Sequence, residues 1–218
     1  DKTADGDKYT KCVPTPFAKV IIREGAYSQT SWALILCNLV YTPAFNWFVT
    51  MLEFGTSYTP DLLNLMLTDV MVNDTKGKGK RNVIDALKNI MTKTPLGKDK
   101  IFADCDITEK KSSSGRETVT LNSLTRCSWS KPDARVILYS LYKFAEKCGG
   151  YYQFSLSTLL DDSIERDGIS PTRIFGLDYN TMVPILNGLS VNYPDYISAS
   201  FSLGLDTISL REDKSSQD

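Results

Sequence analysis

Histidine is absent from the 218 residues of this sequence. Its absence excludes catalytic triads and dyads built on imidazole, metal sites with histidine ligands, and a histidine pH switch near neutrality. The sequence also lacks a P-loop and a G-x-G-x-x-G pattern, so nothing predicts nucleotide hydrolysis or dinucleotide binding. We therefore expect a protein that is not an enzyme and that uses no cofactor and no metal ion.

Cysteine is scarce, and its spacing forms no pattern. The count is odd and no C-x-x-C pair occurs among Cys12, Cys37, Cys105, Cys127 and Cys148. This excludes a disulfide framework and a zinc knuckle. Free thiols are typical of a reducing compartment, so we expect a cytoplasmic protein. Cys37 stands in an apolar run and is predicted to be a core residue.

A long uninterrupted apolar run is missing as well. Residues 25–52 contain no charge, but polar residues and Pro43 interrupt them, and no Lys/Arg cluster follows. The segment predicts two core helices rather than a membrane span. Ser31 is expected to cap the first, over residues 32–41, and Thr42 the second, with Pro43 at its first position.

Charge is unevenly distributed along the chain. Residues 1–75 hold 5 Lys and Arg against 8 Asp and Glu, residues 76–147 hold 16 against 8, and residues 148–218 hold 4 against 10. A basic middle in a nearly neutral chain suits a polyanion such as DNA. An acidic and a basic lobe that attract each other explain the same distribution equally well.

Hydrophobic periodicity predicts helices over residues 62–72 and 82–94, with a basic loop over residues 73–80 between them. In the second helix the apolar positions repeat at helical spacing: Val83, Ile84, Leu87, Ile90 and Met91. Residues 101–124 alternate polar and apolar side chains around a polar turn at 110–115, which predicts short strands.

The last third of the chain predicts helices over residues 133–148, 155–162 and 178–190, then strands over 196–202 and 207–210. Three helices followed by a β-hairpin is the order of a winged helix. The expected fold is α+β and helix-dominated, with a C-terminal winged-helix-like unit. The expected divisions are a helical domain over 1–94, a basic connecting region with short strands over 95–131, the winged-helix-like domain over 132–212 and a disordered tail over 213–218.

Candidate nucleic-acid contacts fall in the basic middle. Four cations between residues 76 and 81 are interleaved with glycines and can follow the phosphates of a nucleic acid. Lys88 lies on the same side of the predicted helix as Arg81. Further along, helical spacing places Arg135, Tyr139 and Lys143 on one face. A solvated helix face beside a disordered loop explains these residues too. The candidates are Lys76, Lys78, Lys80, Arg81, Lys88, Arg135, Tyr139 and Lys143.

The helix expected over residues 178–190 corresponds to a recognition helix, yet it carries no Lys or Arg. Base reading relies on such side chains together with basic contacts to phosphates. Its exposed groups suit a protein surface better, so Tyr179, Asn180 and Thr181 are predicted to bind a protein partner.

A metal-dependent nuclease is a remote third alternative. Asp104, Asp106, Glu109 and Lys111 have the residue types that hold Mg²⁺ near a phosphate. Their spacing is too short for the usual strand arrangement, and a turn follows them directly.

Several apolar segments resemble the bacterial domain of unknown function 4007 family, over roughly residues 15–210. They are WALILCNL at 32–39, TPLG at 94–97, VILYSLY at 136–142, ISPTRIFGL at 169–177 and GLDTI at 204–208. The resemblance implies association with proteins like phosphoadenosine-phosphosulfate reductase, in loci for DNA phosphorothioation and phage defence. It supplies no active-site residues.

These observations predict a non-catalytic, DNA-associating subunit of a bacterial phage-defence or phosphorothioation-related system, without membrane contact. The expected partners are DNA, through the basic middle, and a reductase-like or other defence protein. The alternative is an adaptor that holds a sulfur-transfer or nuclease enzyme and makes no DNA contact of its own.

Overall fold

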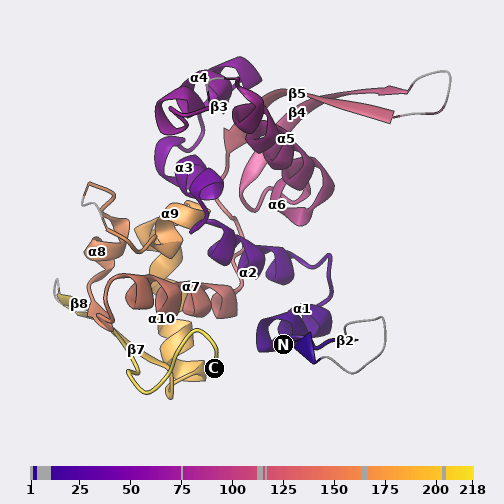
Figure 1. The fold of residues 1–218 in the computed structure, drawn as a ribbon. Coiled ribbons are helices and arrows are strands. Elements are labelled where there is room, and N and C mark those ends of the chain that lie inside the picture. The colour runs from indigo at the N-terminus through magenta and orange to yellow at the C-terminus, as the bar shows by residue number, and fades with distance from the viewer. Residues whose placement is uncertain are drawn as a thin grey trace.

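The structure, a computed structural model, describes residues 2–3, 11–74, 76–111, 115, 117–163, 166–202 and 205–218. Helices prevail and the strands pair in antiparallel sheets, which confirms the expected α+β, helix-dominated class. Figure 1 shows two parts: α3 to α6 with β3 to β5 above, and α7 to α10 with β6 to β8 below. Helix α2 lies between them.

The chain opens with a short strand pair and three helices. These elements are β1 (Lys2–Thr3), β2 (Lys11–Cys12), α1 (Pro16–Glu24), α2 (Gln29–Leu39) and α3 (Pro43–Met51). The two core helices expected from the apolar run are present. However, α2 begins earlier than predicted, because the hydroxyl of Ser28, and not that of Ser31, accepts the capping bond, from the Ser31 amide.

Within the described residues no single helix is long and apolar enough to cross a membrane. Helices α2 and α3 pass that test only as a pair, and they meet at a bend of 99°. Both contribute fully buried side chains to the hydrophobic core, among them Leu36, Cys37 and Phe48.

The upper part combines helices with a protruding hairpin. Its elements are β3 (Ser57–Tyr58), α4 (Pro60–Val70), α5 (Lys78–Lys93), α6 (Pro95–Lys98), β4 (Ala103–Lys111) and β5 (Glu117–Arg126). The strand order is β3-β5-β4, and the distal ends of β4 and β5 extend away from the body as an arm (Figure 1). Since β3 pairs with β5, the boundary expected at residue 94 does not separate two packed units.

The lower part has winged-helix topology with one more helix and one more strand than predicted. Its elements are α7 (Ala134–Lys147), β6 (Gln153–Phe154), α8 (Leu156–Leu160), α9 (Pro171–Phe175), α10 (Tyr179–Asn192), β7 (Ile197–Ser202) and β8 (Leu205–Leu210). Strand β6 pairs with β8, which completes a sheet in the order β6-β8-β7.

Helices α9 and α10 form the helix-turn-helix of this unit. A three-residue turn joins them and contains Gly176 at φ 65°, the left-handed conformation that such turns commonly take. A Cβ at this position would also lie 2.6 Å from the ring of Phe54. Gly176 therefore permits both the turn and the contact with the upper part.

The end of the chain differs from the expected disordered tail. Ser216 donates from its amide and its hydroxyl to the carboxylate of Glu146 on α7, over 2.7 and 3.0 Å. Residues 215 and 218 close a further turn through the Asp218 carboxylate. These bonds place the last residues against the winged-helix-like unit.

Candidate functional site

Helix α5 carries the densest group of cations. Leu87 and Met91 are buried on its inner side, and Val83, Ile84 and Ile90 pack there partly buried, as the periodicity predicts. The helix begins at Lys78, inside the segment expected to be a loop, because Gly77 adopts φ 64° and turns the chain into the first helical turn. The loop cations Lys78 and Lys80 are therefore helical residues.

The solvent side of α5 presents cations without acidic partners. Lys78, Arg81 and Lys93 are exposed and share one side of the helix, with Asn82, Asp85 and Asn89 between them. In the part of the chain that the structure describes, no carboxylate lies within ion-pair distance of five exposed cations: Lys76, Lys78, Arg81, Lys93 and Lys98. We call these five residues the α5 cation face.

Two of the predicted contacts on α5 are already engaged. Lys88 forms an ion pair with Asp85 over 2.8 Å. The ammonium of Lys80 donates to the hydroxyl of Thr68 on α4 over 3.1 Å. Both can still add positive potential, but the cations of the α5 cation face have no carboxylate within ion-pair distance in the described ranges.

The backbone at the start of α5 is also engaged. The carboxylate of Asp74 accepts from the Lys80 amide over 2.7 Å. The backbone amides of Lys80, Gly79 and Lys78 donate hydrogen bonds to this carboxylate, and these bonds hold the pKa of Asp74 below its usual value. The Asp74 carboxylate thus lies where a phosphate would bind at a helix N-terminus, and it already occupies the backbone amides there. Phosphate contact here falls to the side chains.

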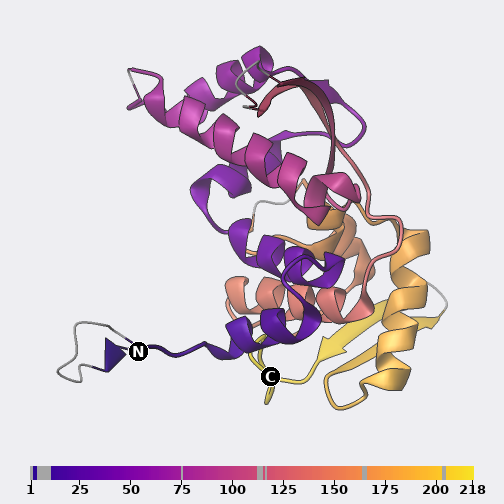
Figure 2. The same ribbon diagram turned by 90° about the vertical axis from the view of Figure 1, so that its right-hand side faces the viewer.

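The predicted contacts on α7 lie elsewhere in the molecule. Figures 1 and 2 both place α7 in the lower part, apart from the start of α5. Arg135 pairs with Asp133 over 2.7 Å and with Glu24 on α1 over 3.1 Å. These contacts raise the pKa of Arg135 above its usual value. The structure therefore does not bring Arg135, Tyr139 and Lys143 onto one surface with α5.

Tyr139 is half-buried between helices. The Tyr139 hydroxyl donates to the side-chain oxygen Oδ1 of Asn38 over 3.0 Å and accepts from the side-chain nitrogen Nδ2 of Asn38 over 2.8 Å. The ring of Phe17 lies 6.2 Å from the Tyr139 ring, between centroids. Tyr139, Arg135 and Lys143 line one cavity with α1 and α2, so this tyrosine is a wall rather than an exposed stacking platform.

Helix α10 presents an uncharged surface. Its residues include no Asp, Glu, Lys or Arg, and its inner side buries Met182, Leu186 and Leu189. Asp178 caps the helix by accepting hydrogen bonds from the amide and the hydroxyl of Thr181, so the Thr181 hydroxyl is engaged within the helix cap. Tyr179 and Asn180 are exposed, and the same side continues over Pro184, Asn187 and Val191.

The acidic residues of β4 do not form a metal site. Asp104 pairs with Lys100 over 2.6 Å, Asp106 accepts from Asn122, and Lys111 pairs with Glu117. Across the described ranges, no three His, Cys, Asp or Glu residues are placed to hold a metal ion together. The geometry gives the nuclease alternative no metal-binding centre.

The sequence prediction omitted Asp74, Lys93 and Lys98. Lys93 follows Lys78 on the same helix side, so helical periodicity could have identified it. Asp74 had no such signal, because its capping role depends on the turn that Gly77 makes. Comparison of the chain with models of protein families, with curated proteins and with solved structures finds no match. The function proposed below therefore depends on the chain's own surfaces.

Proposed function

We propose that this protein is a non-catalytic, DNA-associating subunit that holds the phosphate backbone through the α5 cation face. One observation carries the proposal: five exposed cations lie in α5, in α6 or just before α5, and none has a carboxylate within ion-pair distance among the described residues. Such cations release the counterions of a nucleic acid when they bind it, which is the main source of sequence-independent affinity.

The first turn of α5 supports this proposal. It contains Lys78, Lys80 and Arg81 and no acidic residue. Cations at the positive end of a helix dipole cost stability, about 0.3–1 kcal/mol each at exposed positions. Sequences keep such locally unfavourable choices mainly at functional sites. Binding of a polyanion offsets the cost, because its negative charge meets the side chains of these cations.

The cellular setting of the proposal comes from the sequence resemblance alone. It is a phage-defence or phosphorothioation-related system of the bacterial cytoplasm, with a protein like phosphoadenosine-phosphosulfate reductase as partner. Retention of a labelled partner of that class on the immobilised protein tests this setting separately from DNA binding.

The DNA proposal is tested by fluorescence anisotropy with a labelled duplex over a range of salt concentrations. Replacing Lys78 and Arg81 together with glutamine should lower affinity uniformly across sequences and reduce the salt slope by about 2. The matched control replaces Lys19 and Lys131, which are also exposed, with glutamine. Equal effects of the two double variants would show that net charge alone matters, and no effect of either would reject the interface.

Thermal unfolding of the same variants adds a second readout. Because Lys78 and Arg81 oppose the helix dipole, their replacement should raise the melting temperature while it weakens DNA binding. A folding defect would instead lower both. The opposite signs therefore separate a lost DNA contact from a damaged fold.

The second candidate function, an adaptor without DNA contact, is favoured by α10. Tyr179 is 46% and Val191 78% exposed on a helix without charge. Exposed aromatic and aliphatic groups without charge suit a protein interface. A protein that binds a partner through α10 and shows no salt-dependent DNA binding would be this adaptor.

A further inference from the structure

A cavity of about 650 Å³ lies between α1, α2 and α7, closed on one side by residues 216–218. This volume is within the usual range of small-molecule sites, about 300–1,000 Å³. Its walls are mainly apolar, built from Phe17, Val20, Leu34, Val136 and the ring of Tyr139. The candidate DNA interface on α5 does not include it.

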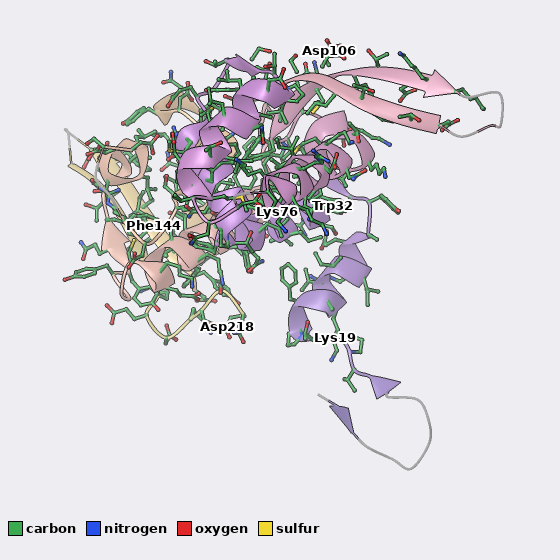
Figure 3. All side chains as sticks on the ribbon, turned by 45° about the horizontal axis from the view of Figure 1, so that its top comes forward. Lys19, Trp32, Lys76, Asp106, Phe144 and Asp218 are labelled. Atoms are coloured by element: carbon green, nitrogen blue, oxygen red, sulfur yellow. The ribbon has the colours of Figure 1, made fainter. Side chains whose placement is uncertain are left out.

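Helix α1 is underpacked where it borders this cavity. Its sequence is strongly amphipathic, yet none of its residues is buried, and Phe17 and Val20 remain half-buried. Figures 2 and 3 show α1, which carries Lys19, at the edge of the molecule. Protein interiors are normally close-packed, so an apolar helix side next to an open cavity leaves room for an apolar occupant.

Several polar groups in the walls already have partners. Asn38 and Tyr139 bond to each other, and Thr30 donates to Asp133 over 2.8 Å. Arg135 is held by Glu24 and Asp133. These groups are engaged and do not call for hydrogen bonds from a ligand's body, which points to an apolar body rather than a nucleobase or a sugar.

Two cations at the cavity remain available. Lys143 has no carboxylate within ion-pair distance among the described residues, and Arg23 is 73% exposed with only a 3.6 Å contact to Glu24. Asp218 also lines the cavity and stays charged, because its carboxylate accepts from the amide and hydroxyl of Ser215, both at 2.9 Å. Arg23, Arg135 and Lys143 outnumber Glu24 and Asp218 in the lining, so the net charge of these side chains is positive.

We propose that this cavity binds an organic monocarboxylate with an apolar body, which packs between Phe17, Val20 and Leu34 while its carboxylate meets Lys143, with Arg23 adding positive potential. Both fatty acids and aromatic acids have this chemistry. Calorimetric titration with decanoate, naphthoate and decanol tells them apart. One of the two acids should bind at least about tenfold more tightly than decanol, and equal affinity for decanol, or no binding of either acid, overturns the proposal.

The role of Lys143 is tested by Lys143→Met, which keeps the aliphatic stem and removes the charge. The affinity for the bound acid should fall about fivefold, as for a partly exposed ion pair, while the affinity for decanol stays unchanged. The matched control is Lys19→Met on the outer side of α1, which should leave both affinities as they are. Equal losses in the two variants would assign the effect to net charge and reject the site.

The location is tested by two tryptophan substitutions on the same helix. Val20→Trp places an indole in the cavity and should abolish binding of the acid. Ile22→Trp adds the same group on the exposed side, where Ile22 is 68% exposed, and should not change it. Circular dichroism checks that both variants are folded. Retained binding in folded Val20→Trp would overturn this location.

Discussion

Arg126, the last residue of β5, donates from Nη2 to the backbone oxygen of Ile174 in α9 over 3.1 Å. The guanidinium is 1% exposed and also bonds the carbonyls of Phe48, Val49 and Arg173. These carbonyls lie in the last turns of α3 and α9, where a helix leaves acceptors without partners. One side chain thus joins the hairpin, the core helices and the helix-turn-helix.

Among the residues that the structure describes, no carboxylate lies within ion-pair distance of this buried cation; the acids nearby, Glu53 and Asp162, pair with Arg173 instead. The rings of Phe54 and Phe102 lie 4.3 and 4.4 Å from the guanidinium carbon. Burial lowers the pKa of Arg126, while helix-end carbonyls and aromatic faces favour its charged form. The charge is held by dipoles and rings rather than by an ion pair.

Replacing Arg126 with methionine should destabilise the protein strongly. Methionine fills much of the volume but removes a donor from four carbonyls, of which, among the described residues, only that of Val49 keeps another side-chain donor, Nε of Arg173. We therefore expect a loss of about 3–5 kcal/mol in the free energy of unfolding. Urea unfolding measures this loss. Arg126→Lys keeps the charge but not the planar fork, so its free energy of unfolding should lie between those of the unchanged protein and the methionine variant. A loss below about 1 kcal/mol for methionine would contradict the role assigned to the fork.

Elements with a strong period were predictable and short elements were not. The apolar stripes of α5 and α7 identified both helices within a few residues. Strand β6 has two residues and α9 has five, which is too short for a period to show. No sequence pattern singles out Arg126, because its four acceptors come from segments far away in the chain.

The sequence predicted which residue types form the candidate site, but not which of them make ion pairs and hydrogen bonds with other parts of the chain. Charge counts placed the cations in the middle of the chain, and α5 does carry them on its solvent side. Glu24, which pairs with Arg135, and Asn38, which bonds to Tyr139, come from α1 and α2, more than a hundred residues earlier. The spacing of residues along α7 cannot reveal that neighbouring helices cover the face on which those residues lie.

Asp74→Asn should strengthen DNA binding. The amide oxygen can still accept from the Lys80 backbone and keep the start of α5 capped, while the negative charge beside the α5 cation face disappears. The affinity should rise by about two- to fivefold at low salt, and the gain should shrink as salt is added. Anisotropy titrations at two salt concentrations measure it, and a weaker or unchanged affinity at low salt would count against DNA contact at this end of α5.

Asp133 should contribute to acid sensitivity. Burial raises its pKa, but hydrogen bonds from Arg135 and Thr30 outweigh this, so the pKa lies below the usual value. For an acid whose pKa is lower in the folded state, the stabilisation is present above the unfolded pKa of about 4 and is lost as the pH falls through the folded value. Asp133→Asn should therefore lower stability at pH 7 and flatten its decline below about pH 4, measured by urea unfolding. An unchanged acid profile would show that these bonds do not stabilise the carboxylate.

Cys37 should react slowly with thiol reagents. It is fully buried, and burial raises the pKa of its thiol to about 12, so both access and thiolate are lacking. Cys105, Cys127 and Cys148 are only partly buried and should be labelled before Cys37. Mass spectrometry of peptides after timed labelling, with and without denaturant, reports each site. Rapid labelling of Cys37 in the native protein would mean that α2 is not a stable core helix.

The α10 surface should respond to protein partners and not to DNA. Asn180 and Asn187 are its exposed amides, and no cation stands beside them on the helix to hold a phosphate. Asn180→Ala with Asn187→Ala should therefore change DNA affinity by less than about 1 kcal/mol, below the cost of losing a good bidentate base contact.

Tyr179→Glu places a charge in the same surface and should weaken association with a protein partner, because that charge would be buried unpaired. Anisotropy with DNA and affinity capture of the partner separate the two effects. If the double asparagine variant stays folded and loses sequence-specific DNA binding, α10 reads bases despite its lack of charge, and the winged-helix-like unit is itself the DNA-binding element.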